Sequence, residues 1–158
     1  MNPIAELLTP DDIHLDLDVS NKGQLLEKVA GMLAGRHGLS EAEVLGSLIA
    51  REQLGSTGLG PGVAIPHARM SQCNAAAGAF VRTKLAIPFD APDGKPVSVF
   101  LGLIVPNQAN ERHLRLLATA AGMLDDRSFR NTLKTVSSPK TVSELLESWP
   151  DIPTAQQE

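Results

Sequence analysis

Two of the four histidines stand where a side chain could act on a ligand. His67 follows a glycine-rich stretch and a short apolar run, and Pro66 restricts the backbone directly before it. His113 comes shortly after Asn110, in the first turn of an expected helix, where the helix dipole favours a neutral imidazole. Each is compatible with an ordinary surface or core histidine, but the end of a strand beside a glycine loop would suit a nucleophile at His67.

The glycine-rich stretch covers residues 55–62 and reads Gly-Ser-Thr-Gly-Leu-Gly-Pro-Gly. It follows a predicted helix rather than a strand, and it lacks the closing Gly-Lys-Ser/Thr of a nucleotide-binding P-loop. Its spacing also differs from the dinucleotide fingerprint and from the nucleophile elbow of α/β-hydrolases. What remains is a backbone that can turn sharply and present N–H groups to an anion. The alternative is a glycine-rich connection that binds no ligand.

The remaining polar residues form no comparable pattern. His14 is expected on the polar side of a strand, and His37 at the end of a helix, where a cation is favourable. The chain has one cysteine, Cys73, and no His-Glu-x-x-His, so no metal site is predicted. Adjacent carboxylates such as Asp125 and Asp126 are interpreted as solvated charges rather than as a hydrolytic pair.

The first third of the chain predicts one strand and two helices that lead into the glycine-rich stretch. Residues 13–19 alternate apolar and polar side chains, the pattern of a half-buried strand. A capping pattern at Asn21 opens an amphipathic helix that runs to Gly38. A second capping pattern at Ser40 opens a helix that runs to about Leu54. The glycine-rich stretch therefore begins where the second helix ends.

The rest of the chain predicts further strands followed by helices. Short apolar runs bounded by turn residues predict strands at residues 63–65, 75–83, 84–89 and 97–105. Helices are then expected from the Asn110 cap through Met123, over 127–136, and over 142–149 behind a Thr141 cap. Helices on both sides of the strand run predict a three-layer α/β/α sandwich, with a mixed β-sheet flanked by helices on both faces.

Length and composition set the broad class of the protein. The chain has 158 residues, 42% of them hydrophobic, and a net charge of −4. We expect a single domain over residues 1–150 and a flexible tail over 151–158. The acidic balance argues against a nucleic-acid partner. No apolar run approaches the ~20 residues of a membrane helix, and no secretory signal pattern is present, so we predict a cytoplasmic protein without membrane insertion.

A resemblance to a known family rests on residues 52–68, which run from Glu52 through the glycine-rich stretch to Ile65-Pro66-His67-Ala68. They resemble the phosphorylation-site signature of the enzyme IIA components of the fructose/mannitol class, in the bacterial phosphoenolpyruvate-dependent phosphotransferase system. Within that class the chain is most similar to the nitrogen-regulatory type (the PtsN type), over nearly its whole length. Further matching stretches lie at 51–58, at 88–91 with 96–97, and at 105–106 followed by 113–114.

The resemblance implies a set of site residues and a chemistry. His67 is expected to be the phospho-acceptor, His113 the second active-site histidine and Arg51 a nearby cation. A phosphohistidine is reactive enough to pass its phosphoryl group onward, and transfer through a loose transition state depends on groups that stabilise the equatorial oxygens. Besides Arg51, these groups are expected to be the hydroxyls of Ser56 and Thr57 and loop N–H groups such as that of Gly58. No cofactor or metal is required by this chemistry.

Several functions stay open on the sequence. We expect a phosphocarrier that takes its phosphoryl group from an HPr-like protein, without turnover of a small molecule of its own. Its phosphorylation state would control target proteins, for which potassium transporters and sensor kinases are candidates. The alternative is a fructose/mannitol-type IIA that passes phosphate to a separate IIB for sugar uptake. A binding module with an unused histidine and a metal-assisted hydrolase are weaker interpretations. For the donor protein we expect a docking surface with an apolar centre at Leu59, Pro61 and Met70.

Overall fold

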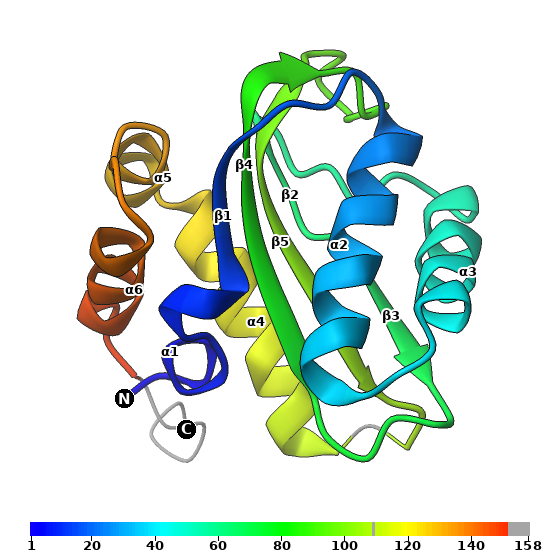
Figure 1. Ribbon diagram of the computed structural model, residues 1–158. Coiled ribbons are helices and arrows are strands. Elements are labelled where there is room, and N and C mark those ends of the chain that lie inside the picture. Colours follow the sequence, from blue (N-terminus) through cyan, green and yellow to red (C-terminus); the bar gives the residue numbers. More distant parts are fainter. Residues whose placement is uncertain (109, 152–158) are drawn as a thin grey trace.

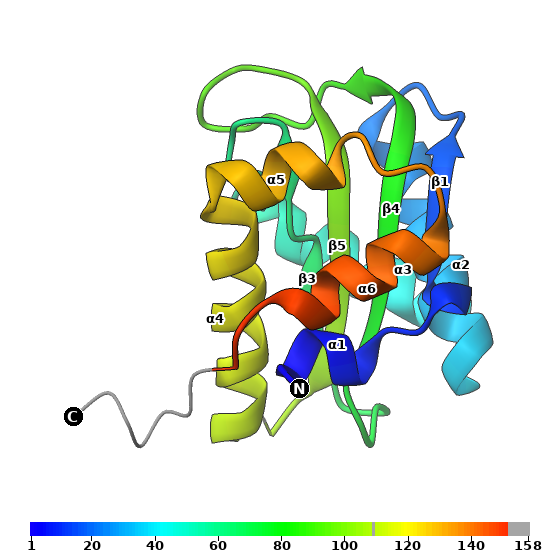
Figure 2. The ribbon, with the colours of Figure 1, turned by 90° about the vertical axis from the view of Figure 1, so that its left-hand side faces the viewer.

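The structure is a computed structural model that describes residues 1–108 and 110–151. It confirms the three-layer α/β/α sandwich with a mixed sheet: α2 and α3 cover one face, and α1, α4, α5 and α6 lie on the other (Figures 1 and 2). The elements, in chain order, are α1 (Pro3–Leu7), a 3-10 turn η1 (Pro10–Asp12), β1 (Ile13–Leu17), α2 (Lys22–His37), α3 (Glu41–Gln53), β2 (Val63–Ala64), β3 (His67–Met70), β4 (Ala77–Ile87), β5 (Val97–Pro106), α4 (Glu111–Asp125), α5 (Arg127–Leu133) and α6 (Pro139–Ser148).

The sheet brings β2 and β3 to the same side of β5. Its strand order is β1-β4-β5-β2, and β3 also pairs with β5. β1 runs parallel to β4, β4 antiparallel to β5, and both β2 and β3 parallel to β5. Val63 lies opposite Val99, and His67 lies opposite Leu103. The two short strands therefore follow one another along β5, and His67 opens the second of them.

Each face of the sheet contributes to its own hydrophobic cluster. On the α2 and α3 face, Phe100 and Ile104 of β5 pack with residues of those two helices. On the opposite face, Leu101 and Leu103 pack with α4, α5 and α6. This is the alternation expected of a strand buried on both sides. The sheet face on which a strand residue lies can therefore be inferred from its position in the strand.

The helix caps nearest the glycine-rich stretch are as predicted, but one distant cap is not. The side chains of Asn21, Ser40 and Asn110 accept hydrogen bonds from backbone N–H groups in the first turns of α2, α3 and α4. The prediction that Thr141 caps the last helix was wrong. Ser138 is the N-cap and Pro139 the first helical residue, because a proline has no N–H to leave unsatisfied there.

One strand prediction was wrong, and another was correct in place but missed the strand that follows it. The runs 75–83 and 84–89 are one strand, β4, in which pairing with β5 shifts register between Arg82 and Ile87 and no turn occurs. The run 63–65 is only the start of the paired region, since β3 resumes at His67. Pro66 has no N–H to donate to a sheet, yet its carbonyl accepts from Leu103 N at 2.9 Å and keeps the chain beside β5.

The N-terminal segment contains two short elements that the sequence pattern did not predict. The amide of Asn2 is buried and donates to Leu146 O at 2.8 Å and Trp149 O at 2.9 Å, which ties α1 to the end of α6.

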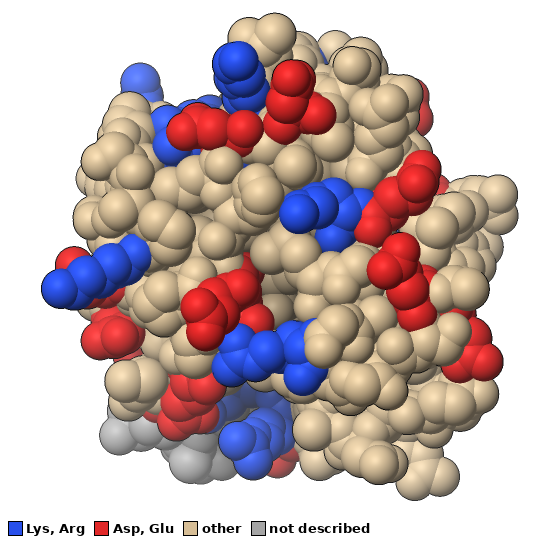
Figure 3. Space-filling model, in the orientation of Figure 1, with Lys and Arg blue, Asp and Glu red and all other residues tan. Residues whose placement is uncertain are grey.

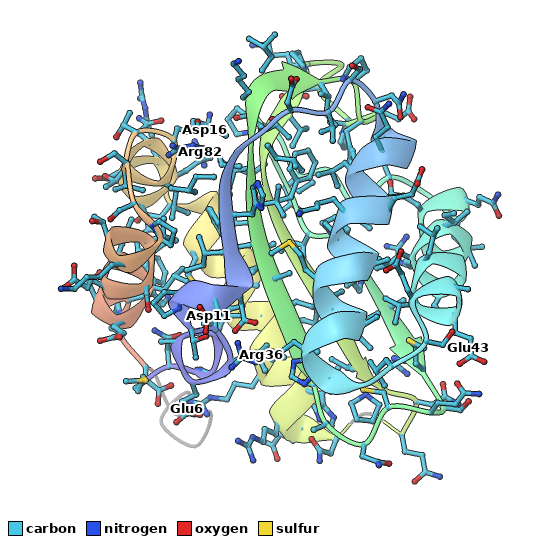
Figure 4. The ribbon with its side chains drawn as sticks, in the orientation of Figure 1. Glu6, Asp11, Asp16, Arg36, Glu43 and Arg82 are labelled. Atoms are coloured by element: carbon cyan, nitrogen blue, oxygen red, sulfur yellow. The ribbon has the colours of Figure 1, made fainter. Side chains whose placement is uncertain are left out.

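On β1, Asp16 has a left-handed φ of 55°, and its Oδ1 lies 3.7 Å from Arg82 Nη2 of β4 (Figure 4). Apart from Asp151, the expected flexible tail lies outside the described residues.

Candidate functional site

His67 has a defined ring orientation. Its side chain is half-buried, and Nδ1 lies 2.7 Å from the carbonyl oxygen of Ile65. Because a carbonyl can only accept, Nδ1 must carry the proton of this hydrogen bond. In the neutral ring, Nε2 then keeps its lone pair. The backbone two residues upstream thus selects which nitrogen of His67 can act as a nucleophile.

His67 lies on the α4 side of the sheet. Its neighbours in β3, Ala68 and Met70, are buried in the cluster beneath α2 and α3. Successive side chains of a strand point to opposite faces, so the imidazole is on the other face. Ile65, two residues before His67, packs into the cluster that includes α4.

Because Met70 is 4% exposed, the expectation that it helps to form a docking surface was wrong.

The glycine-rich stretch folds back along the residues that lead to His67. Leu59 N donates to Val63 O at 2.9 Å, and Ile65 N donates to Thr57 O at 3.1 Å. Between these bonds Gly58 forms an isolated antiparallel bridge with Ala64. Residues 57–59 therefore lie alongside 63–65, and the loop is joined to the strand edge that carries the histidine.

The three loop groups expected to bind phosphate are hydrogen-bonded within the protein. Ser56 Oγ donates to Phe89 O at 2.8 Å and accepts from Gly58 N at 3.0 Å. Thr57 is buried, and its N–H and hydroxyl both donate to the carboxylate of Glu52. A phosphoryl group would have to compete with these partners, so a phosphate-binding role for Ser56, Thr57 and Gly58 stays a prediction. In the structure, the hydrogen bonds of these three residues stabilise the conformation of the loop.

Arg51 lies at the entrance to the loop. It is in the last turn of α3, half-buried, and its Nη1 donates to Gly55 O at 2.9 Å. No ion pair among the described residues involves its guanidinium. A guanidinium carries five N–H donors in a planar fork, so further donors are available to an anion.

His113 is held in the opposite tautomer from His67. It is the third residue of α4, where its N–H donates to Asn110 Oδ1 and its Nδ1 accepts from Asn110 N, each at 3.2 Å. Since Nδ1 accepts, the neutral ring carries its proton on Nε2. His113 therefore offers a donor, whereas His67 offers a lone pair. His113 also lines a hollow of about 410 Å³ between α4 and α1, which neither His67 nor Arg51 lines.

Two residues that the sequence analysis gave no role occupy the base of the loop. Glu52 is buried, with 4% of its side chain exposed, and its Oε2 lies 2.6 Å from Lys22 Nζ at the start of α2. The ammonium of Lys22 also lies 3.4 Å from Asp90 Oδ2 and 4.6 Å from the centre of the Phe89 ring. Glu52 is the first residue of the 52–68 signature, but a sequence pattern does not show that it is buried.

Comparison with known proteins places this geometry in a family. A family model described as "Phosphoenolpyruvate-dependent sugar phosphotransferase system, EIIA 2" matches residues 6–149. The chain belongs to this family. Because the match includes residues 52–68, the resemblance predicted from the phosphorylation-site signature is confirmed for the chain as a whole.

Relatives of the chain include nitrogen regulatory proteins. That of Pseudomonas aeruginosa is 35% identical over 144 residues, which cover 90% of this chain and 94% of that protein. The crystal structure of the nitrogen regulatory protein IIA-Ntr from Neisseria meningitidis is 47% identical, with a TM-score of 0.87, and the match covers 90% of this chain and 98% of that one. The mannitol IIA of Escherichia coli shares the fold, with a TM-score of 0.73 at 22% identity over 88% of this chain and 98% of its own.

Over residues 1–108 and 110–151 there is no group of three His, Cys, Asp or Glu side chains placed to hold a metal ion. No helix in the described part is long and apolar enough to cross a membrane. On the side of the molecule shown in Figure 3, which runs from α5 and α6 across β1 to α2 and α3, acidic and basic side chains are interspersed. The apolar side chains of Leu59 and Leu114 are exposed, at 46% and 56%.

Proposed function

We propose that this protein is a phosphocarrier that accepts a phosphoryl group from an HPr-like protein on Nε2 of His67. The observation that carries the proposal is the hydrogen bond from His67 Nδ1 to Ile65 O, which leaves Nε2 as the ring nitrogen with a free lone pair. In the transfer, a P–Nε2 bond forms as the P–N bond of the donor's phosphohistidine breaks, and the electron pair of that bond returns to the donor nitrogen. The proton on Nδ1 stays in place.

Two further groups are proposed to stabilise the transferred phosphoryl group. The Nε2–H of His113 would donate to a phosphoryl oxygen, and the guanidinium of Arg51 would supply a fixed positive charge. Within the described part of the chain, no hydrogen bond joins His67, His113 and Arg51 to one another. We therefore propose that the phosphoryl group itself brings the three together. Loss of one such stabilising group costs about 10²-fold or more in rate.

Labelling on His67 tests the proposal. The protein is incubated with radiolabelled phosphoenolpyruvate, enzyme I and an HPr-like protein, as wild type, His67→Ala and the control His37→Ala, whose histidine is exposed at the end of α2. Wild type and His37→Ala should carry an acid-labile, base-stable label, and His67→Ala should carry none. An undiminished label in His67→Ala would refute the assignment of the acceptor, and an unlabelled wild type would favour a pure binding module.

The roles of His113 and Arg51 are separated by single-turnover rates. His113→Ala and Arg51→Ala should each transfer more slowly while still becoming labelled on His67. A variant that transfers at the wild-type rate would return its residue to a structural role. A His113→Ala protein that takes no label, while His67→Ala still does, would make His113 the acceptor.

The regulatory use of the phosphoryl group is proposed from the relatives, which are named nitrogen regulatory proteins. On this basis the phosphorylation state of His67 controls binding to target proteins, among which potassium transporters and sensor kinases are candidates. Delivery to a IIB for sugar uptake is the second candidate, because the family description names a sugar phosphotransferase system. Fast transfer from the phosphorylated protein to a fructose- or mannitol-class IIB would favour sugar uptake, and no transfer would favour regulation.

A further inference from the structure

We propose that Glu52 is a positioning residue for His67: its buried carboxylate holds the glycine loop against the Ile65 segment that orients the imidazole. The inference rests on the proposed function and deepens it. Among the described residues the polar partners of Glu52 are Thr57 and Lys22, not His67, and Glu52 is buried. Any effect of Glu52 on His67 must therefore pass through other residues, and the hydrogen bonds identify these residues.

A continuous series of hydrogen bonds runs from Glu52 to the acceptor ring. The N–H and hydroxyl of Thr57 donate to the Glu52 carboxylate, with Thr57 N at 3.0 Å from Oε1. Thr57 O accepts from Ile65 N at 3.1 Å, and Ile65 O accepts from His67 Nδ1 at 2.7 Å. Each link fixes the position of the next residue, so a displaced Thr57 carries Ile65, and with it the acceptor carbonyl of His67.

The coupling along this series is geometric rather than electronic. The N–H and the C=O of Ile65 belong to different peptide groups, and the same holds for Thr57. Polarisation of one hydrogen bond is therefore not passed directly to the next, as it is when the N–H and C=O belong to one peptide group. Loss of Glu52 should change how often the His67 ring is oriented for transfer, and should not change the nucleophilicity of a ring that is correctly oriented.

Lys22 supplies the charge that a buried carboxylate requires. It is the first residue of α2, where the helix dipole disfavours a cation, and its Nζ lies 2.6 Å from Glu52 Oε2. A cation at that position is explained by the carboxylate facing it, because burying an unpaired charge is strongly unfavourable. Both oxygens of Glu52 are thus occupied: Oε1 accepts from Thr57, and Oε2 faces Lys22 and also accepts from Thr57 N at 3.2 Å.

The same cluster joins a third segment to the loop. Lys22 Nζ lies over the ring of Phe89, and Phe89 O accepts from Ser56 Oγ at 2.8 Å. The start of α2, the end of α3 and the residues after β4 thus all meet at the base of the glycine loop. Through these contacts Glu52 and Lys22 join the loop to all three segments.

The test uses the isosteric variant Glu52→Gln in the full-length protein. Glutamine keeps an oxygen for Thr57 but removes the charge that faces Lys22. The matched control is Glu43→Gln, in the first turn of the same helix, where the side chain is exposed (Figure 4). Two readouts are taken: the single-turnover rate of phosphoryl transfer, and the ring tautomer of His67, read from the nitrogen shifts and ring couplings of ¹⁵N-labelled histidine by NMR.

We expect Glu52→Gln to transfer about tenfold more slowly and to show a second tautomer of His67, because small displacements of a reacting group have large effects on rate. Glu43→Gln should match wild type in both readouts. A wild-type rate or a wild-type ring spectrum in Glu52→Gln would overturn the proposal. If Glu52→Gln fails to fold, Thr57→Val replaces it, because this substitution removes only the hydroxyl hydrogen bond to Glu52. The same two readouts are taken, and a wild-type rate or a wild-type ring spectrum would again overturn the proposal.

The spectrum separates this inference from the proposed function. If the wild type accepts no label on His67, the proposed function fails. The ring tautomer of unphosphorylated Glu52→Gln still reports whether Glu52 orients His67, because that measurement requires no phosphoryl donor.

Discussion

Replacement of Gly58 by alanine should destabilise the protein through a steric conflict alone. Its φ lies outside the left-handed region, so the backbone conformation is open to alanine. A Cβ built there would lie 2.9 Å from the Ala91 methyl carbon, 3.0 Å from the Ala91 backbone and 3.2 Å from Ser56 Oγ. Carbon atoms pack at about 3.5–4.0 Å, so the loop or the Ala91 segment must move by roughly 0.5–1 Å.

The expected cost follows from this displacement. Overpacking of a well-packed position costs about 1–3 kcal/mol. In a chain of this size each kcal/mol lowers Tm by about 2–4 °C, so we expect a decrease of roughly 2–12 °C. Because Gly58 bridges Ala64, the movement also reaches the strand edge before His67. The phosphotransfer rate should therefore fall further than the loss of folded protein explains, by about tenfold.

A double-mutant cycle with Ala91→Gly isolates the conflict. Removing the methyl group of Ala91 deletes the nearest clash, but the backbone of residue 91 would still lie 3.0 Å from the new methyl group, so Gly58→Ala should be partly rescued in the double variant. Gly46→Ala serves as a control for the substitution itself. No atom lies within 4 Å of a Cβ at that position inside α3, and alanine there should stabilise by about 0.5–1 kcal/mol.

Urea and thermal unfolding of the four proteins of the cycle provide the measurement. A Gly58→Ala protein as stable as wild type would refute the reasoning, since the close approach would then be relieved without cost. Purely additive effects of Gly58→Ala and Ala91→Gly would also refute it, because they would place the conflict elsewhere.

Three further predictions concern groups outside the site. Burial, and then the charge of Lys28, lowers the pKa of His14 below its usual value of about 6.5. The unfolded chain then takes up a proton before the folded one, so stability should fall as pH drops from 7 through that value, and unfolding midpoints of His14→Gln should depend less on pH. Burial raises the pKa of the Cys73 thiol, so a maleimide at pH 8 should label it slowly in native protein and rapidly in urea. Arg130 is buried and donates to two carbonyls at the end of α4. Arg130→Met should therefore lower the unfolding free energy by about 1–3 kcal/mol, as measured by urea titration. Arg127→Met, at an exposed position, should leave the unfolding free energy nearly unchanged.

Local patterns in the sequence predicted much of the fold because they depend on neighbouring residues. Capping side chains at Asn21 and Ser40 act within one turn, so their helices could be placed from sequence alone. The division of β4 into two strands was wrong because Lys84, Leu85 and Ala86 are exposed on a continuous strand. The sequence analysis interpreted residues 75–83 and 84–89 as two apolar runs with a boundary between Thr83 and Lys84. Only pairing with β5 shows that the strand continues.

In the candidate site, too, residues marked by local sequence could be predicted, and residues that depend on distant partners could not. His67 was selected for its place after a glycine loop, a local feature, and the structure adds the Ile65 hydrogen bond that orients it. Glu52 could not be assigned because its partner, Lys22, is distant in sequence, and nothing near Glu52 indicates that it is buried. Interactions of this kind arise from the packing of α2 against α3, which a single sequence does not specify.

The strand order has a consequence for how the protein is made. β2 and β3, which flank Pro66, have β5 as their sheet partner, and β5 begins only at Val97. As the chain leaves the ribosome, the segment that carries His67 emerges before the strand that will align it. A nascent chain that ends before Val97 contains the whole of residues 52–68, and β1 and β4 as well, but it lacks the strand with which β2 and β3 pair. The strand pairing that aligns the His67 segment is thus completed late in synthesis, after the segment itself has left the ribosome.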